Sequence, residues 1–226
     1  AKLAAAFAKS PGGTPVEPID FVRAGAPPTL LLTGSVDVVA APRITYDFAA
    51  ALRVTGALPE GLRGAFLRNG PNPQFPPIGR YHLFDGDGMI HGVTFDGEGG
   101  ASYANRWVRS AGFEAERAAG RALFGGLSEF AMPPDDSFAR VGPIKNTANT
   151  HIVSHAGHLL ALMEGLGPIE VADDLTTIGP FDFDGRLAGS MTAHPKTDPV
   201  TGEMVFFGYS PVAPYLRVHS CDRSGA

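Results

Sequence analysis

The histidines are the side chains of this sequence best suited to hold a metal, and their spacing decides whether they can act together. His151, His155 and His158 lie close together in HIVSHAGH. On a helix this spacing would put imidazoles on one face, as in some zinc sites. The β-branched residues after His151 favour a strand instead, and the Ala-Gly pair after His155 is typical of a hairpin turn. His158 is therefore expected on a different strand, which argues against a local metal site.

His194 stands between an alanine and a proline in TAHPKTDPVTGEMVFFGYS, just before a turn and a hydrophobic strand. Taken alone, a histidine beside a strand is more often a hydrogen-bonded structural residue than a ligand. Metal affinity depends on several ligands presented together. A ligand role for His194 therefore requires partners elsewhere in the protein.

The stretch FDGDGMIHG contributes Asp85, Asp87 and His91, and its DGDG resembles part of a calcium loop. An EF-hand needs ligands at six loop positions, including a closing glutamate, and nothing suitable follows. Turn chemistry, in which the aspartates bind nearby backbone amides, is the better interpretation. The sequence shows no phosphate-binding glycine loop, no nucleophile elbow and no Cys/His nucleophile pair. Cys221 is expected to be a small buried or half-buried residue rather than a nucleophile.

The composition favours an all-β protein without nucleic-acid partners. The 29 glycines and 20 prolines are spread evenly, which is typical of many short strands separated by turns. The net charge is -5, and the 18 lysines and arginines form no run, so no surface for a phosphate backbone is expected. A single cysteine suits a reducing compartment, and we expect a cytoplasmic protein.

The order of strand and turn signals predicts a repeating architecture. HGVTF and ASYANRWV flank the turn DGEGG as in a hairpin, and FEAERAAGRALFGG predicts one helix ended by Gly125 and Gly126. Strand pairs recur about every 20 residues and four-strand units about every 40, which indicates propeller blades. The sequence stops on the turn DRSGA, which would leave a sheet edge unpaired, so we expect a truncated C-terminus.

The first 53 residues differ from the rest of the chain. AKLAAAFAKS indicates a short amphipathic helix or a disordered end. PPTLLLTGSVDVVAAP is too polar and too short to span a bilayer, which needs roughly 20 apolar residues. Its apolar character fits a peripheral membrane contact.

Five stretches resemble, in sequence and order, the carotenoid cleavage oxygenase family. The resemblance runs from about residue 54 to residue 226, whereas residues 1–53 match poorly. The stretches are LRNGPNPQF with YHLFDGDGMIHGV, NRWVRSAGFEAERAAGRALFG, NTANTHIVSHAGHLLALMEG, TAHPKTDPVTGEMVFFGYS and PYLRVHSCDRSG. The resemblance implies that residues 54–226 form about half of a seven-bladed β-propeller, the N-terminal half of the family fold.

The same resemblance implies a non-haem Fe(II) on the propeller axis, held by four histidines. With O2 as co-substrate, this iron would split a C=C bond of a carotenoid, apocarotenoid or stilbene into two carbonyl products. By the motif AHP, His194 would be the first iron ligand, and the other three would lie in later blades outside this chain. Glu164 would hydrogen-bond a ligand histidine, and Thr150 would lie beside an open iron position. Without the resemblance, Glu164 is interpreted as a surface turn residue and Thr150 as an ordinary strand residue.

The substrate expected from the resemblance depends on a missing lysine. Family members that cleave lignin-type stilbenes hold the substrate phenol with a tyrosine, for which Tyr81 is the candidate, and with a lysine expected near VRSAGFE. This chain has no lysine between Lys9 and Lys145, and Gly112 occupies the expected region. The sequence therefore favours a carotenoid or apocarotenoid, with a lignostilbene-type dioxygenase as the alternative.

Two further interpretations involve no iron. The chain could belong to a non-catalytic propeller fragment, or to a propeller that binds a partner protein or glycan. Because a single imidazole cannot hold iron, residues 1–226 expressed alone are expected to be inactive, to hold no stoichiometric iron and to aggregate.

Overall fold

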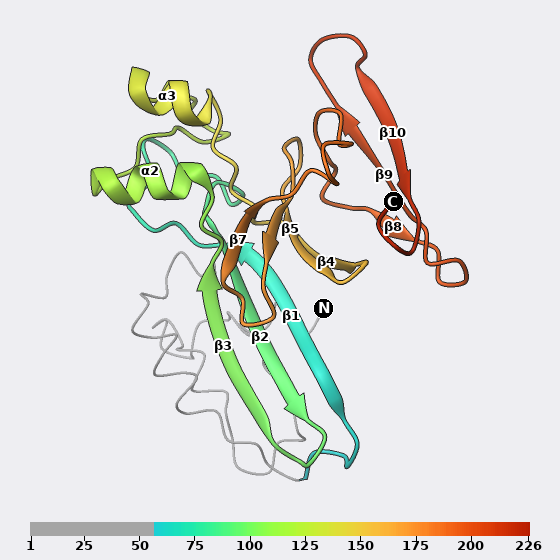
Figure 1. Cartoon of the computed structure of the whole chain (residues 1–226). Coiled ribbons are helices and arrows are strands. Elements are labelled where there is room, and N and C mark those ends of the chain that lie inside the picture. Colours follow the sequence, from blue (N-terminus) through green and yellow to red (C-terminus); the bar gives the residue numbers. More distant parts are fainter. Residues whose placement is uncertain (1–56) are drawn as a thin grey trace, which may run out of the picture.

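The computed structural model describes residues 57–226, so the predicted N-terminal segment 1–53 lies outside the described residues. Within this range, ten strands form three antiparallel sheets, and two helices lie between the first sheet and the second in chain order (Figure 1). No helix of the described part is long and apolar enough to cross a membrane. The elements are β1 (Arg63–Pro71), β2 (Gly88–Asp96), β3 (Ala101–Trp107), α2 (Ala111–Ala119), α3 (Asp135–Val141), β4 (His151–His155), β5 (His158–Leu162), β6 (Ile169–Val171), β7 (Thr177–Pro180), β8 (Lys196–Thr197), β9 (Met204–Tyr209) and β10 (Leu216–Cys221).

Each sheet is built from strands that follow one another along the chain, in the orders β1-β2-β3, β4-β5-β6-β7 and β8-β9-β10. The all-β prediction is confirmed, and so are the hairpin around DGEGG and the hairpin between β4 and β5. The second hairpin turns at Ala156 and Gly157, whose φ angles are 50° and 85°. Positive φ at both central residues matches the right-handed twist of the flanking strands.

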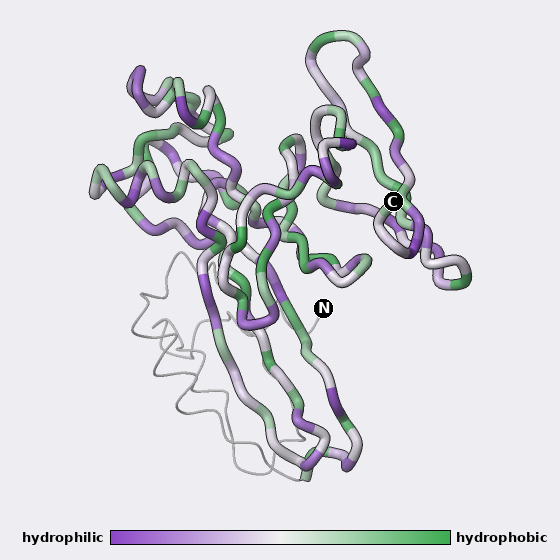
Figure 2. The backbone as a smooth tube through the Cα atoms, viewed as in Figure 1, coloured by the Kyte–Doolittle hydropathy of each residue, from purple (hydrophilic) through white to green (hydrophobic). Residues whose placement is uncertain are grey.

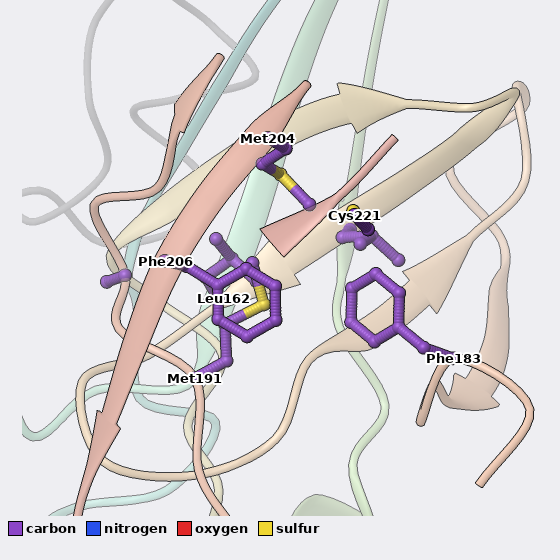
Figure 3. Close-up of a cluster of buried hydrophobic side chains, with 8 residues drawn as sticks. Leu162, Phe183, Met191, Met204, Phe206 and Cys221 are labelled. Atoms are coloured by element: carbon purple, nitrogen blue, oxygen red, sulfur yellow. The ribbon is translucent and has the colours of Figure 1, made fainter. Parts of the chain in front are cut away.

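The four-stranded sheet lies between the other two, and the alternation of side chains along β5 explains why. Leu160 and Leu162, each 1% exposed, pack against Met204 and Phe206 of β9, as Figure 3 shows for Leu162. Ala161 points the other way, into a second cluster shared with the first sheet. Successive strand residues face opposite sides of a sheet, so an apolar run such as HLLAL is suited to a sheet covered on both faces. Figure 2 shows this hydrophobic run at the centre of the molecule.

Two helices interrupt the strands, whereas the sequence predicted one. Helix α2 is capped at its start by Ser110, whose hydroxyl accepts a hydrogen bond from the N–H of Phe113, and at its end by Gly120 with φ 67°. The prediction that it continues to Gly125 and Gly126 is wrong, because a left-handed glycine at 120 already ends it. Helix α3 follows Pro134 and carries two aspartates in its first turn. These start signals are present in PPDDSFARVG and could have been used to predict it.

Candidate metal centre

The segment that carries His194 joins β7 to β8 and is anchored to the third sheet. Thr192 donates its backbone N–H to the carbonyl of Phe207 at 2.7 Å. Thr192 and Ala193 are almost fully buried, whereas the side chain of His194 is exposed. Pro195 follows directly, and a residue before proline is held in an extended conformation. The segment therefore has a fixed backbone and presents one imidazole.

Glu164 fixes this segment through a single carboxylate oxygen. Its Oε2 accepts hydrogen bonds from the N–H of Ala193 at 2.8 Å and from the hydroxyl of Thr192 at 3.1 Å. The Thr192 hydroxyl in turn accepts the N–H of His194 at 3.2 Å. Within residues 57–226 the hydrogen bonds of Glu164 go to the backbone and hydroxyl beside His194. Its expected bond to a ligand histidine stays a prediction.

His151 approaches the same segment from β4. Its Nδ1 lies 2.9 Å from the carbonyl oxygen of Ala193, and its ring is nearly parallel to that of His194. The ring centroids are 6.4 Å apart and the interplanar angle is 25°. From the sequence, His151 is recognised only as part of a local histidine cluster, because this contact joins β4 to a loop that is 42 residues further along the chain.

Thr150 is the exposed residue immediately before β4. Its backbone N–H donates to the carbonyl of Leu162 at 2.9 Å, and its hydroxyl donates to the side-chain oxygen of Asn149 at 3.1 Å. Thr150 is thus one residue from His151, which contacts the His194 segment. The structure places Thr150, Glu164 and His194 in one connected region, and the role of Thr150 beside an open iron position stays a prediction.

Tyr81 lies in the loop between β1 and β2, which is fastened to the same region. The buried amide of Asn149 donates to the carbonyls of Phe84 and Gly86, each at 2.7 Å. A side chain at Gly86 would come within 2.9 Å of the Tyr81 hydroxyl, so glycine permits this close approach. Burial, followed by the charge of Asp85, raises the pKa of Tyr81.

The local clusters considered in the sequence form no metal site in the described part of the chain. His155 and His158 lie on adjacent strands, as predicted, and face each other across the β4–β5 turn. His158 contacts Glu170 through Nδ1 at 2.5 Å, while His155 contacts the carbonyl of Asp222 at 2.8 Å. No three His, Cys, Asp or Glu side chains in residues 57–226 gather as metal ligands.

Cys221 and His155 form a contact that the sequence did not reveal, since they belong to different sheets. The sulfur lies 3.2 Å from Nε2 of His155. That nitrogen must carry a proton to bind the Asp222 carbonyl, so it cannot accept the thiol proton. Burial, with the charges of Asp222 and Glu203, raises the pKa of Cys221. The pair therefore lacks the base that would activate a nucleophile.

A buried charge cluster joins α2 to the β1–β2 loop and was also missed. Lys145 lies 2.9 Å from Asp87 and 2.7 Å from Glu116, and the three side chains are 11%, 3% and 2% exposed. Burial opposes the charge on Lys145, but the two carboxylates outweigh it and raise its pKa. A methyl group at Gly112 would fall 2.4 Å from Cγ of Lys145, so the lysine fills the space beside that glycine.

His194 suits a metal ligand because of its imidazole donor and because its backbone is held in place. Neutral imidazole is a good donor for iron, and within residues 57–226 neither ring nitrogen of His194 is used in a hydrogen bond. Its backbone is held by Glu164 through Thr192 and Ala193. The described residues thus fit one ligand of an iron site.

Comparison with known proteins gives the class of fold and then the family. The solved structures that resemble the chain are carotenoid oxygenases of the propeller type, consistent with three successive antiparallel sheets. A family model described as retinal pigment epithelial membrane protein (RPE65) matches residues 42–226. Because this match takes in most of the chain, the chain belongs to this family, which is that of the carotenoid cleavage oxygenases.

Curated relatives and solved structures agree with this assignment. Carotenoid 9,10(9',10')-cleavage dioxygenase 1 of Arabidopsis thaliana is 44% identical over 190 residues, which are 77% of this chain and 35% of that protein. The carotenoid cleavage oxygenase of Mycobacterium tuberculosis is 44% identical over 173 residues, 75% of this chain and 32% of that protein. The chain therefore spans about a third of the length of these relatives.

Among solved structures, the lignostilbene dioxygenase of Pseudomonas brassicacearum is similar with a TM-score of 0.65 and 35% identity. The similarity covers 76% of this chain and 36% of that chain. A variant of the Synechocystis apocarotenoid oxygenase is similar with a TM-score of 0.64 and 30% identity, over 76% of this chain and 38% of that one. Both substrate classes considered in the sequence are thus represented among the relatives.

Proposed function

We propose that this chain is part of a non-haem Fe(II) dioxygenase that cleaves a C=C bond of a carotenoid or apocarotenoid with O2. The observation that carries the proposal is the support of His194, whose backbone N–H and two preceding residues are fixed by Glu164 and Thr192. The remaining three histidine ligands would come from residues outside this chain. The greater length of the curated relatives supports this view.

The residues of this chain would position the iron ligand and limit the space around the iron, rather than act as acids or bases. The iron, once bound, would supply the oxidation that converts the alkene into two carbonyl products. Four neutral imidazoles, His194 among them, would hold the iron and would leave room for O2 and an electron-rich alkene. Glu164 and Thr192 keep the backbone at His194 in place, and Thr150 would limit the space beside an open iron position.

The surroundings of Lys145 support a carotenoid or apocarotenoid over a phenolic stilbene. Lys145 fills the space beside Gly112, but its ammonium group is already paired with Asp87 and Glu116. It is therefore not available to hold a phenolate. The charge of Asp85 near Tyr81 further disfavours an anionic substrate at that tyrosine.

A lignostilbene-type activity is the second candidate, favoured by the similarity to the Pseudomonas brassicacearum enzyme. The two are separated by supplying the full-length, iron-loaded protein with an apocarotenal and with a 4-hydroxystilbene. O2 uptake and aldehyde products are measured by electrode and mass spectrometry. We expect a higher kcat/KM for the apocarotenal and little effect of Tyr81→Phe on it. Cleavage of the stilbene alone, abolished by Tyr81→Phe, would establish the second candidate.

The third interpretation, a propeller that binds a partner without iron, is excluded if the purified full-length protein contains iron. Metal analysis of the purified full-length protein decides this point. We expect close to one iron per chain, whereas a folded protein without iron would leave only the binding-module or inactive-fragment interpretation.

A further inference from the structure

The carbonyl of Ala193 stands directly before the proposed ligand His194, and a side chain from β4 binds it. Ala193 is fully buried, so its carbonyl needs a partner within the protein. That partner is Nδ1 of His151, at 2.9 Å. Glu164 accepts the N–H of the same residue, so both polar backbone groups of Ala193 are held.

The contact determines which ring nitrogen of His151 is the donor. A carbonyl oxygen can only accept a hydrogen bond, so Nδ1 of His151 must carry a proton. The ring is thereby fixed in orientation, nearly parallel to the ring of His194 at a centroid separation of 6.4 Å. This separation lies within the range of aromatic ring contacts. His151 therefore restrains both the backbone before His194 and the space into which the His194 ring can turn.

We infer that His151 is a positioning residue for the metal ligand His194. The inference rests on the proposed function, because it assigns a role toward the iron that His194 would bind. It adds a contact between β4, which supplies His151, and the segment before β8, which supplies His194 and is anchored to the third sheet through Thr192. Relative movement of these sheets would change the direction of the ligand, and the His151 contact opposes that movement.

The test compares two substitutions of nearly equal size in the full-length protein. Asparagine places its amide nitrogen the same number of bonds from the backbone as Nδ1 of histidine, so His151→Asn can still donate to the Ala193 carbonyl. His151→Leu has a similar shape and no donor. His158→Leu is the control, since His158 lies across the β4–β5 turn and contacts Glu170 instead.

Two readouts are recorded: the rate at which a chelator removes iron, and the visible ligand-field spectrum of the cobalt-substituted protein. We expect His151→Leu to lose iron roughly ten- to a hundredfold faster, the usual scale for residues that support a ligand. Its cobalt bands should shift. His151→Asn and His158→Leu should behave like the unsubstituted protein. If His151 had a merely structural role, His151→Asn would not restore the behaviour of the unsubstituted protein, and His151→Leu would not change the cobalt spectrum.

The outcomes separate this inference from the proposed function. If the unsubstituted protein holds iron, loses it with His194→Ala, and is unaffected by His151→Leu, the role of His151 is wrong and the iron site stands. If His151→Asn loses iron as fast as His151→Leu, the donor hydrogen bond is not the cause and the inference is again wrong. A folded full-length protein without iron would overturn both.

Discussion

At the scale of single residues, the candidate site depends on one carboxylate oxygen. Oε2 of Glu164 accepts hydrogen bonds from both the Thr192 hydroxyl and the Ala193 N–H. Within residues 57–226 its other oxygen has no hydrogen-bond partner. In the proposed enzyme that second oxygen would accept the ring N–H of a ligand histidine from a later blade. One glutamate would then hold two ligands, one through its backbone and one through its ring.

Glu164→Gln tests whether the two carboxylate oxygens have these separate roles. The amide oxygen can keep the Thr192 and Ala193 bonds, but the amide NH2 would face the ring N–H of the second histidine, donor against donor. We expect a folded protein whose iron affinity or turnover falls roughly ten- to a hundredfold. Chelator kinetics and circular dichroism measure this. Glu170→Gln is the control, because Glu170 contacts His158 away from the site. Equal behaviour of the two variants would return Glu164 to a purely structural role.

His91 makes stability depend on pH. It is 2% exposed, and burial, followed by the positive charge of Arg68, lowers its pKa to about 4. The unfolded chain, with a histidine pKa of about 6.5, takes up the proton first as pH falls, so the protein loses stability between about pH 6.5 and 4. The loss between pH 7.5 and pH 5 should be about 2 kcal/mol and should vanish in His91→Gln. Urea unfolding at both pH values measures it, and an unchanged pH dependence in the variant would contradict the assignment.

At the scale of elements, α2 and the β1–β2 loop are joined by the cluster of Lys145, Asp87 and Glu116. Glu116 also accepts the backbone N–H of Leu123 at 2.9 Å, which ties the chain after α2 back onto the helix. Asp87 accepts the N–H of Gln74 at 3.1 Å. The cluster thus fixes the loop that carries Tyr81, although none of its members is close to His194 in the sequence.

Lys145→Met should be strongly destabilising, because it leaves two carboxylates buried without their cation. Removing one partner of a buried ion pair costs about 3–5 kcal/mol. Arg109→Met is the matched control: its pair with Glu114 is about half exposed, and such pairs contribute about 1 kcal/mol or less. Chemical denaturation of both variants measures the difference. If the two variants lost similar amounts of unfolding free energy, the Lys145 cluster would not be a major source of stability in this region.

The elements show how far the sequence could predict the molecule. Alternation and turn residues were sufficient for the β2–β3 and β4–β5 hairpins, because these depend on neighbours in sequence. The end of α2 was misplaced because Gly120 was overlooked in favour of the later glycine pair. The contacts of His151 with Ala193 and of His155 with Cys221 could not be predicted, since they depend on how separate sheets pack. The role of His194 as an iron ligand was predicted only through the resemblance of AHP to a family motif.

At the scale of the whole molecule, the third sheet has one covered and one open face. Met204 and Phe206 of β9 are buried, whereas Phe207 is 41% exposed beside its cross-strand partner Val218, which is 71% exposed. A sheet with apolar residues on both faces is suited to packing on both sides. In the proposed full-length enzyme, we expect a further sheet to cover this open face.

The 226-residue chain expressed alone should therefore self-associate through this face. Phe207→Thr combined with Val218→Thr should reduce the association, while Val200→Thr, in the exposed turn before β9, should not. Size-exclusion chromatography with light scattering at several concentrations measures it. If the unsubstituted 226-residue chain stayed monomeric, the expectation that this open face packs against another surface would be wrong.

The most direct test of the central claim is the iron content of the full-length protein with and without His194. Iron per chain is measured by atomic emission, and the fold by circular dichroism, for the unsubstituted protein and for His194→Ala. Alanine offers no donor in place of the imidazole, so we predict that the variant keeps its fold and loses most of its iron and its polyene cleavage. A folded His194→Ala protein that retains full iron would contradict the assignment of His194 as an iron ligand.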